Sequence, residues 1–182
     1  ISASTPEQEQ LLRYRHEKSE EPRHTAHERQ KTPYQHLHTA NILVSRELML
    51  SYPFDERLRN YGYEDVLFGK TLRQNRIPIT HIDNPMGFCT FEQNADFVAK
   101  TEEGLRTLYQ FRSELRGYSR LLTLVSGIHI PAILWLMRLW HQVFGATERR
   151  NLCGSRPYLL VFKLYRLGYY LSYSSTEKVN FS

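Results

Sequence analysis

The stretch Tyr61-Gly-Tyr-Glu-Asp-Val-Leu-Phe-Gly-Lys70 places two adjacent carboxylates directly after a glycine-containing turn. The apolar residues that follow predict a helix from Asp65 to Gln74 that ends at Asn75. The free N–H groups and the positive dipole end of a helix start hold a carboxylate ionised and fix its orientation. Such a carboxylate can act as a general base. The alternative interpretation is that the two acids only match the helix dipole.

Two short apolar runs flank this predicted helix. Asn41-Ile-Leu-Val44 precedes it and Ile77-Pro-Ile-Thr-His-Ile82 follows it, which predicts strands over residues 40–44 and 77–82. Between the first run and the helix, Ser45 is typical of a residue that caps a short helix, here Arg46 to Leu50. The alternation of strands and helices predicts an α/β domain in which the central helix packs on a mixed, incomplete sheet.

The N-terminal part is charged and rich in histidine. Thr5, Pro6 and Gln8 have the spacing of a capped helix start. The stretch from Arg13 to Lys31 contains several histidines, but no complete set of zinc ligands closes a metal site. We therefore interpret this stretch as a solvated helix and loop.

An ordered set of motifs in the stretch Thr39 to Phe88 resembles the second half of family-2 glycosyltransferases of the GT-A type. The motifs are Thr39-Ala-Asn-Ile-Leu-Val-Ser-Arg46, Phe54-Asp-Glu56, Tyr61-Gly-Tyr-Glu-Asp65, Phe68-Gly-Lys-Thr-Leu72, Ile82-Asp-Asn-Pro85 and, nearer the C-terminus, Leu164-Tyr-Arg-Leu-Gly-Tyr-Tyr170. The resemblance implies that residues 1–93 form the C-terminal half of a nucleotide-diphospho-sugar transferase domain. Residues 94–182 would then form a helical, basic and aromatic extension.

The resemblance also implies a reaction. It is an inverting transfer of a sugar from a nucleotide-sugar donor to a hydroxyl of a saccharide or lipid-linked saccharide, in surface polysaccharide or glycolipid synthesis. Asp65 matches the catalytic base of the family. Glu64, with Tyr63 and Gly62, matches the residues that hold the acceptor.

The donor side of the family is only partly represented in this sequence. Thr39 and Asn41 match a strand end that lines the donor, although a polar pair that closes a turn is an equal alternative. The full enzyme is expected to use a divalent metal, Mg or Mn, held by an Asp-x-Asp motif that this chain lacks. A metal-binding histidine of the family would fall near Phe88; His81 could replace it or make ordinary contacts. We therefore expect a piece of a longer enzyme that is inactive alone.

The C-terminal segment carries the excess positive charge. Residues 101–182 contain eleven bases, five acids and 13 of the 23 aromatic residues. Leu121 to Met137 has 17 residues without a formal charge, and it could lie at a membrane surface, pack on its own domain or span a membrane. Trp135 and Trp140 are typical of interface anchors. We expect a cytoplasmic protein bound peripherally to the anionic inner face of the cell membrane.

Two rival functions follow from the same residues. In the first, the chain is a non-catalytic, membrane-associated helical module and the Glu64-Asp65 pair only starts a helix. In the second, it binds nucleic acid through its basic tail. The aromatic residues of the tail, however, alternate with Leu and Ile at helical spacing, and no nucleic-acid motif occurs. We therefore expect no nucleic-acid partner.

Overall fold

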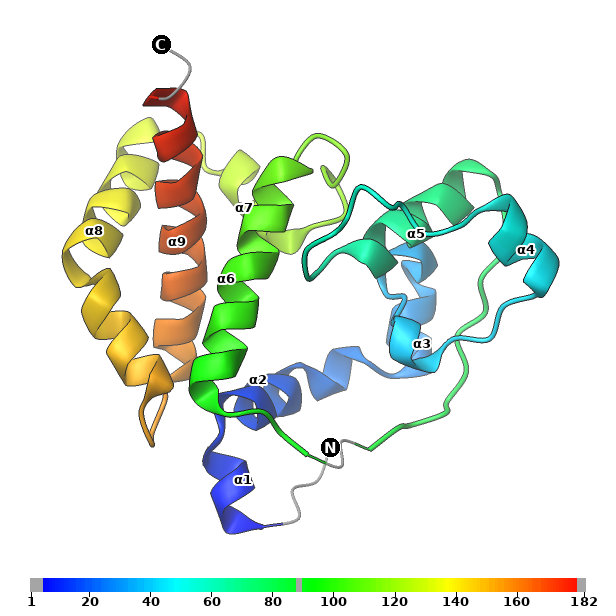
Figure 1. The fold of residues 1–182 in the computed structure, drawn as a ribbon, viewed down its shortest axis with the longest axis horizontal. Coiled ribbons are helices and arrows are strands. Elements are labelled where there is room, and N and C mark those ends of the chain that lie inside the picture. Colours follow the sequence, from blue (N-terminus) through cyan, green and yellow to red (C-terminus); the bar gives the residue numbers. More distant parts are fainter. Residues whose placement is uncertain (1–4, 88–89, 180–182) are drawn as a thin grey trace.

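The computed structural model describes residues 5–87 and 90–179, with side chains as far as Tyr173. Its α-helices are α1 (Pro6–Gln10), α2 (Leu12–Glu20), α3 (Ala26–Gln30), α4 (Arg46–Ser51), α5 (Glu64–Gln74), α6 (Asn94–Gln110), α7 (Arg120–Gly127), α8 (Pro131–Cys153) and α9 (Leu159–Val179). Short 3₁₀ turns are η1 (Glu21–Arg23), η2 (Pro33–Gln35) and η3 (Thr39–Asn41). Helices α6, α8 and α9 pack together at one end of the long axis, and α3, α4 and α5 lie at the other (Figure 1).

The predicted α/β fold with an incomplete mixed sheet is wrong. Every regular element in the described ranges is helical, and neither residues 40–44 nor residues 77–82 form a strand. Part of the first run turns into η3, and the second run is irregular. Both runs nevertheless pack where the sheet was expected, because Ile42, Ile77 and Ile79 contact the Phe68 and Leu72 side of α5.

Side chains form hydrogen bonds with the backbone of residues 77–82, where a neighbouring strand would have formed them in a sheet. The Gln30 side chain donates to the Ile79 carbonyl at 3.2 Å and accepts from the His81 amide at 2.8 Å. The Tyr34 hydroxyl donates to the Ile77 carbonyl at 3.0 Å. A strand needs a partner for its ladder, and an isolated pair of strands is only marginally stable in water. The runs are apolar enough for strands, but they do not pair with each other.

The helix boundaries follow the local signals of the sequence. Thr5 accepts a hydrogen bond from the Gln8 amide at 3.4 Å and starts α1. Ser45 accepts from the Leu48 amide at 3.1 Å and starts α4. The central helix, α5, ends at Asn75 as predicted. These predictions are confirmed because a cap depends only on residues a few positions apart.

The N-terminal helix α2 packs against the C-terminal helices and is hydrogen-bonded to α6. Leu12 is fully buried and packs with Phe97 of α6 and Phe162 of α9. The buried Asn94 side chain accepts from the Leu12 amide at 2.7 Å and donates to the Gly154 carbonyl at 2.7 Å. The stretch from Arg13 to Lys31, which was interpreted as a solvated helix and loop, is therefore solvated only on its outer side, because the His16 ring lies 5.2 Å from the Phe162 ring and Ala26 is buried. Its inner side forms part of the core.

Within residues 94–179 the structure describes four helices, α6 to α9. Residues 121–137 divide into α7 and the start of α8 at Ile128, His129 and Ile130, with Pro131 as the first residue of α8. Proline is well suited to this position because its missing N–H would have no helical partner there. No helix in the described parts of the chain combines the length and apolar character that crossing a membrane requires.

Candidate functional site

Asp65 lies in a cleft of about 280 Å³ between the start of α5 and helices α2, α6 and α9. Its polar and charged lining comprises Arg13, His16, Glu17, Tyr61, Tyr63, Asp65, Lys100, Thr101 and Arg166. Phe97 and Phe162 provide apolar walls, and their ring centroids are 5.5 Å apart. A cleft with aromatic walls and a few polar groups is the usual form of a small-molecule site.

The turn before α5 is built so that Asp65 faces this cleft. Gly62 has φ of 101° and Tyr63 has φ of 71°, so two successive residues adopt left-handed conformations. Helix α6 holds this turn through Thr107, whose hydroxyl donates to the Tyr61 carbonyl at 3.1 Å. A Cβ at Gly62 would lie 3.3 Å from the Gly104 Cα, so the two backbones approach closely at these glycines.

Burial raises the pKa of Asp65 to about 6, and the neighbouring charge of Glu64 contributes to the increase. Hydrogen bonds from backbone amides oppose this shift, including the 2.8 Å bond from the Val66 N–H to Asp65 Oδ1. No cation within the described residues forms an ion pair with Asp65. A carboxyl group with this pKa can both accept and release a proton near neutral pH.

Two of the three cations in the cleft are held by carboxylates. Arg13 donates to Glu17 Oε1 at 2.9 Å and to Glu92 Oε1 at 2.7 Å. Lys100 Nζ lies 2.7 Å from Glu92 Oε2. These pairs fix the rim of the cleft and compensate its positive charge.

Arg166 is the third cation, and it has no such partner. Its guanidinium carbon lies 5.5 Å from the centroid of the Phe162 ring. Its buried Nε has no hydrogen-bond acceptor among the described residues, and none of their carboxylates pairs with the side chain. Burial lowers the pKa of His16, with a further contribution from the charge of Arg166, so this imidazole is neutral at pH 7. Arg166 is therefore available to a ligand that carries oxygen acceptors.

The structure brings together some of the residues that the sequence indicated. Asp65, Tyr63 and Gly62 all line the cleft. Glu64 does not line it and acts on Asp65 through its charge. The donor-side residues Thr39 and Asn41 lie elsewhere, in η3, where the Asn41 side chain donates to the Asn84 carbonyl at 2.7 Å.

The chain matches no protein-family model, no curated protein and no solved structure. The functional argument therefore depends on the residues and contacts of the chain itself.

The divalent metal expected for the full enzyme stays a prediction about the longer protein. No three His, Cys, Asp or Glu side chains gather in the described part of this chain in an arrangement that could hold a metal ion. His81 makes an ordinary contact, 3.0 Å from the Pro33 carbonyl through its Nε2. Phe88, near which the family would place a metal-binding histidine, lies outside the described residues.

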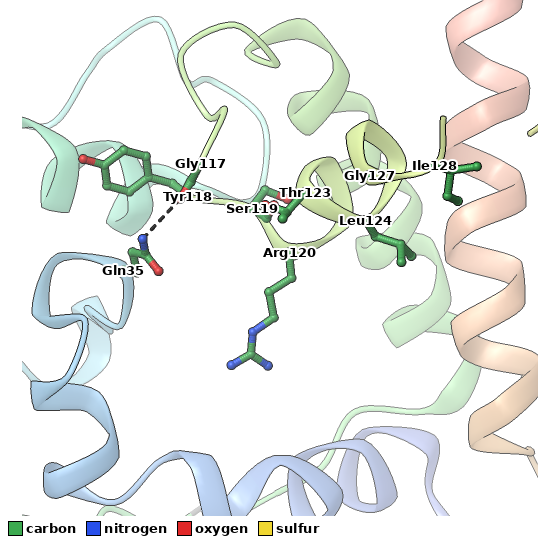
Figure 2. Close-up of a pocket in the computed structure, with 9 residues that line it drawn as sticks. All are labelled: Gln35, Gly117, Tyr118, Ser119, Arg120, Thr123, Leu124, Gly127 and Ile128. Atoms are coloured by element: carbon green, nitrogen blue, oxygen red, sulfur yellow. Dashed lines mark hydrogen bonds between the residues drawn. The ribbon is translucent and has the colours of Figure 1, made fainter. Parts of the chain in front are cut away.

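A second cleft, of about 480 Å³, lies between η2 and α7 and provides a contrast (Figure 2). Gln35 and Gly117 close one side, where the Gln35 side chain donates to the Gly117 carbonyl at 3.2 Å. Arg120 extends from α7, and its guanidinium lies 3.1 Å from Glu20 Oε2. The described lining contains no carboxylate, so this cleft has no candidate base.

Sequence reasoning missed most of the Asp65 cleft. Arg13, His16 and Glu17 come from the stretch that was interpreted as solvated, and Phe97 comes from another helix. They are far from Asp65 in the sequence, and no local pattern connects them with it. Arg166 had a signal, because it lies inside Leu164-Tyr-Arg-Leu-Gly-Tyr-Tyr170, the element that resembles the end of the glycosyltransferase extension.

Proposed function

We propose that this chain binds the acceptor and supplies the catalytic base of an inverting glycosyltransferase. The observation that carries the proposal is Asp65, a carboxyl group with a pKa of about 6 and no described counterion, in a cleft with aromatic walls. The resemblance of the motifs around it to family-2 glycosyltransferases supplies the reaction. The acceptor is a saccharide or a lipid-linked saccharide.

In this reaction the chain accepts one proton, through Asp65. The Asp65 carboxylate accepts the proton of an acceptor hydroxyl while that oxygen attacks the anomeric carbon of the donor sugar. The new C–O bond forms as the bond to the nucleotide diphosphate breaks, and the leaving diphosphate takes the electron pair. Attack from the opposite face inverts the anomeric centre. Water then removes the proton from Asp65.

The other groups of the cleft position the acceptor. Phe97 and Phe162 are buried behind the cleft and fix its apolar floor, and the Phe162 ring supports the Arg166 guanidinium 5.5 Å away. Arg166 offers donors to sugar oxygens or to a phosphate of a lipid-linked acceptor. The nucleotide-sugar binds to a segment that contains the Asp-x-Asp motif, which is not part of this chain.

The alternative is a non-catalytic helical module. The entirely helical architecture of the described residues favours it, because a donor-binding sheet is not part of that architecture. The two functions differ in what they require of the Asp65 cleft. Catalysis requires saccharide binding there, and a module that only associates with membranes does not.

Acceptor binding can be tested on this chain directly. Saturation-transfer NMR with a panel of oligosaccharides is expected to show binding with a Kd of about 1 mM, typical of a small open cleft. Arg166→Gln should weaken binding about tenfold, because it removes a charged donor. Arg120→Gln is the matched control, since Arg120 lines the other cleft. Saccharide signals that are absent, or equal in wild type and Arg166→Gln, would contradict the proposal.

A further inference from the structure

Helix α8 exposes an apolar face that no part of the described chain covers. Ile133, Trp135, Leu136, Leu139, Trp140 and Val143 have between 38% and 62% of their surface exposed. The opposite side of the helix, with Gly145 and Leu152, is buried. In Figure 1, α8 is the outermost helix at its end of the molecule, with α9 on its inner side. Contiguous apolar patches of this kind mark interaction surfaces in soluble proteins.

Positive charge continues the same face. Leu136, Val143 and Arg150 are seven residues apart, which is almost two helical turns, so they lie in one row along α8. Arg150, Arg156 and Lys163 are exposed and form no ion pair with a described residue. Arg150 thus places a cation in the row of the apolar face, while Arg156 and Lys163 add two exposed cations just after α8 and in the first turns of α9.

Negative charge is almost absent from this region. Between residues 115 and 173 there are eight bases and a single acid, Glu148. Glu148 is buried, and it accepts hydrogen bonds from Trp140 Nε1 at 2.9 Å and contacts His141 Nδ1 at 3.1 Å. The exposed side chains of α8 therefore include no carboxylate, and the one acid that lies against them from another helix, Glu102 of α6, is paired with Arg149 at 2.8 Å.

We propose that this face of α8 binds the surface of an anionic lipid bilayer. The helix has one apolar side and one side buried in its own domain, so it would lie in the plane of the interface. Trp135 and Trp140 are the residue type that is enriched at the level of the headgroups. A second copy of the chain would bring an equally cationic surface to the same place, which disfavours self-association. The inference does not depend on the proposed glycosyl transfer.

The two tryptophans of the chain, Trp135 and Trp140, both lie on α8 and report on this contact directly. Vesicles of phosphatidylcholine and phosphatidylglycerol in equal amounts should shift their emission to shorter wavelengths. Vesicles of phosphatidylcholine alone should bind on the order of 100-fold more weakly, because three unpaired bases gain nothing from a neutral surface. Unchanged emission with the anionic vesicles would overturn the proposal.

Two double variants distinguish binding through the α8 face from non-specific binding through any exposed apolar side chain. Leu136→Ser with Val143→Ser should weaken vesicle binding about tenfold or more, because two apolar side chains no longer enter the interface. Leu43→Ser with Leu50→Ser is the matched control, since these leucines are 100% and 71% exposed but lie away from α8. Circular dichroism should be unchanged in both. An equal loss of vesicle binding in both double variants would overturn the proposal. The proposal would also be wrong if the tryptophan emission shifted without lipid and analytical ultracentrifugation showed a dimer.

Discussion

Replacing Asp65 by Asn is expected to lower the turnover of glycosyl transfer about 100-fold or more. The amide keeps the size of the side chain and can still accept the Val66 N–H, but it cannot take the proton of the acceptor hydroxyl. The measurement is kcat with saturating donor, in a polypeptide that also contains the donor-binding segment. Donor affinity should stay the same, because the donor is expected to bind to another segment of the longer protein.

Glu64→Gln is the matched control for this substitution. It removes a neighbouring carboxylate without altering the lining of the cleft, so it should reduce kcat far less than Asp65→Asn does. Near-normal turnover in a folded Asp65→Asn enzyme would remove Asp65 from the mechanism. The two acids would then be only a charged helix start.

The same Asp65→Asn substitution should stabilise the fold at pH 7 by about 1–3 kcal/mol. The folded-state pKa of about 6 lies above the ordinary aspartate value of 3.8, so the folded state binds the Asp65 proton more tightly than the unfolded state does. The stability from this group is fully present below pH 3.8 and is lost as the pH rises through about 6. Urea unfolding of both proteins across this range should show the difference growing with pH and then levelling off. A difference that is constant with pH would contradict the raised pKa.

Gly69→Ala is expected to destabilise the protein by about 2–4 kcal/mol, with a fall in Tm of about 5–15 °C. A Cβ at Gly69 would lie 2.1 Å from the Tyr34 carbonyl oxygen and 3.2 Å from Leu37 Cδ1. Because the nearest atom belongs to the backbone, α5 and η2 must move apart to admit a methyl group. Alanine is the better helix former by about 1 kcal/mol, so a net loss of stability measures the close packing of η2 on α5.

Gly127→Ala provides the control for the glycine substitution. Apart from its chain neighbours and the backbone of its own helix, nothing lies within 4 Å of the position that a Cβ would take at Gly127, and this glycine is also helical, at the end of α7. Its substitution should change the free energy of unfolding by about 1 kcal/mol or less. If thermal unfolding gives the same Tm for Gly69→Ala and wild type, the packing of η2 against α5 is not as described.

Local features of the fold could be predicted from the sequence. The pairing of strands could not, because the predicted sheet does not form in the described residues. Thr5 and Ser45 cap helices, and Asn75 ends one, because each acts on residues within a few positions. Residues 77–82 have the composition of a strand, but a strand exists only beside a partner. In the structure the side chains of Gln30 and Tyr34 take the place of that partner.

The residues of the candidate site also fall into a group that the sequence indicated and a group that it did not. The turn at Gly62 and Tyr63 and the acid at Asp65 are contiguous, so a single motif indicated all three. Arg166 and Phe97 reach the cleft only because α9 and α6 pack together beside α5. That packing depends on apolar faces of long helices, which predict burial but not which helices meet. The candidate base was therefore visible in the sequence, whereas the walls of its cleft were not.

The pH dependence of kcat/KM for the acceptor tests most directly whether Asp65 is the base of a glycosyl transfer. This parameter reports the ionisation of the free enzyme. For the wild type it should rise about tenfold per pH unit below pH 6 and be constant above it, following the pKa of about 6 of Asp65. The Asp65→Asn enzyme should lose this step. A wild-type profile that is flat between about pH 5 and 7.5, or a step that persists in Asp65→Asn, would contradict the account.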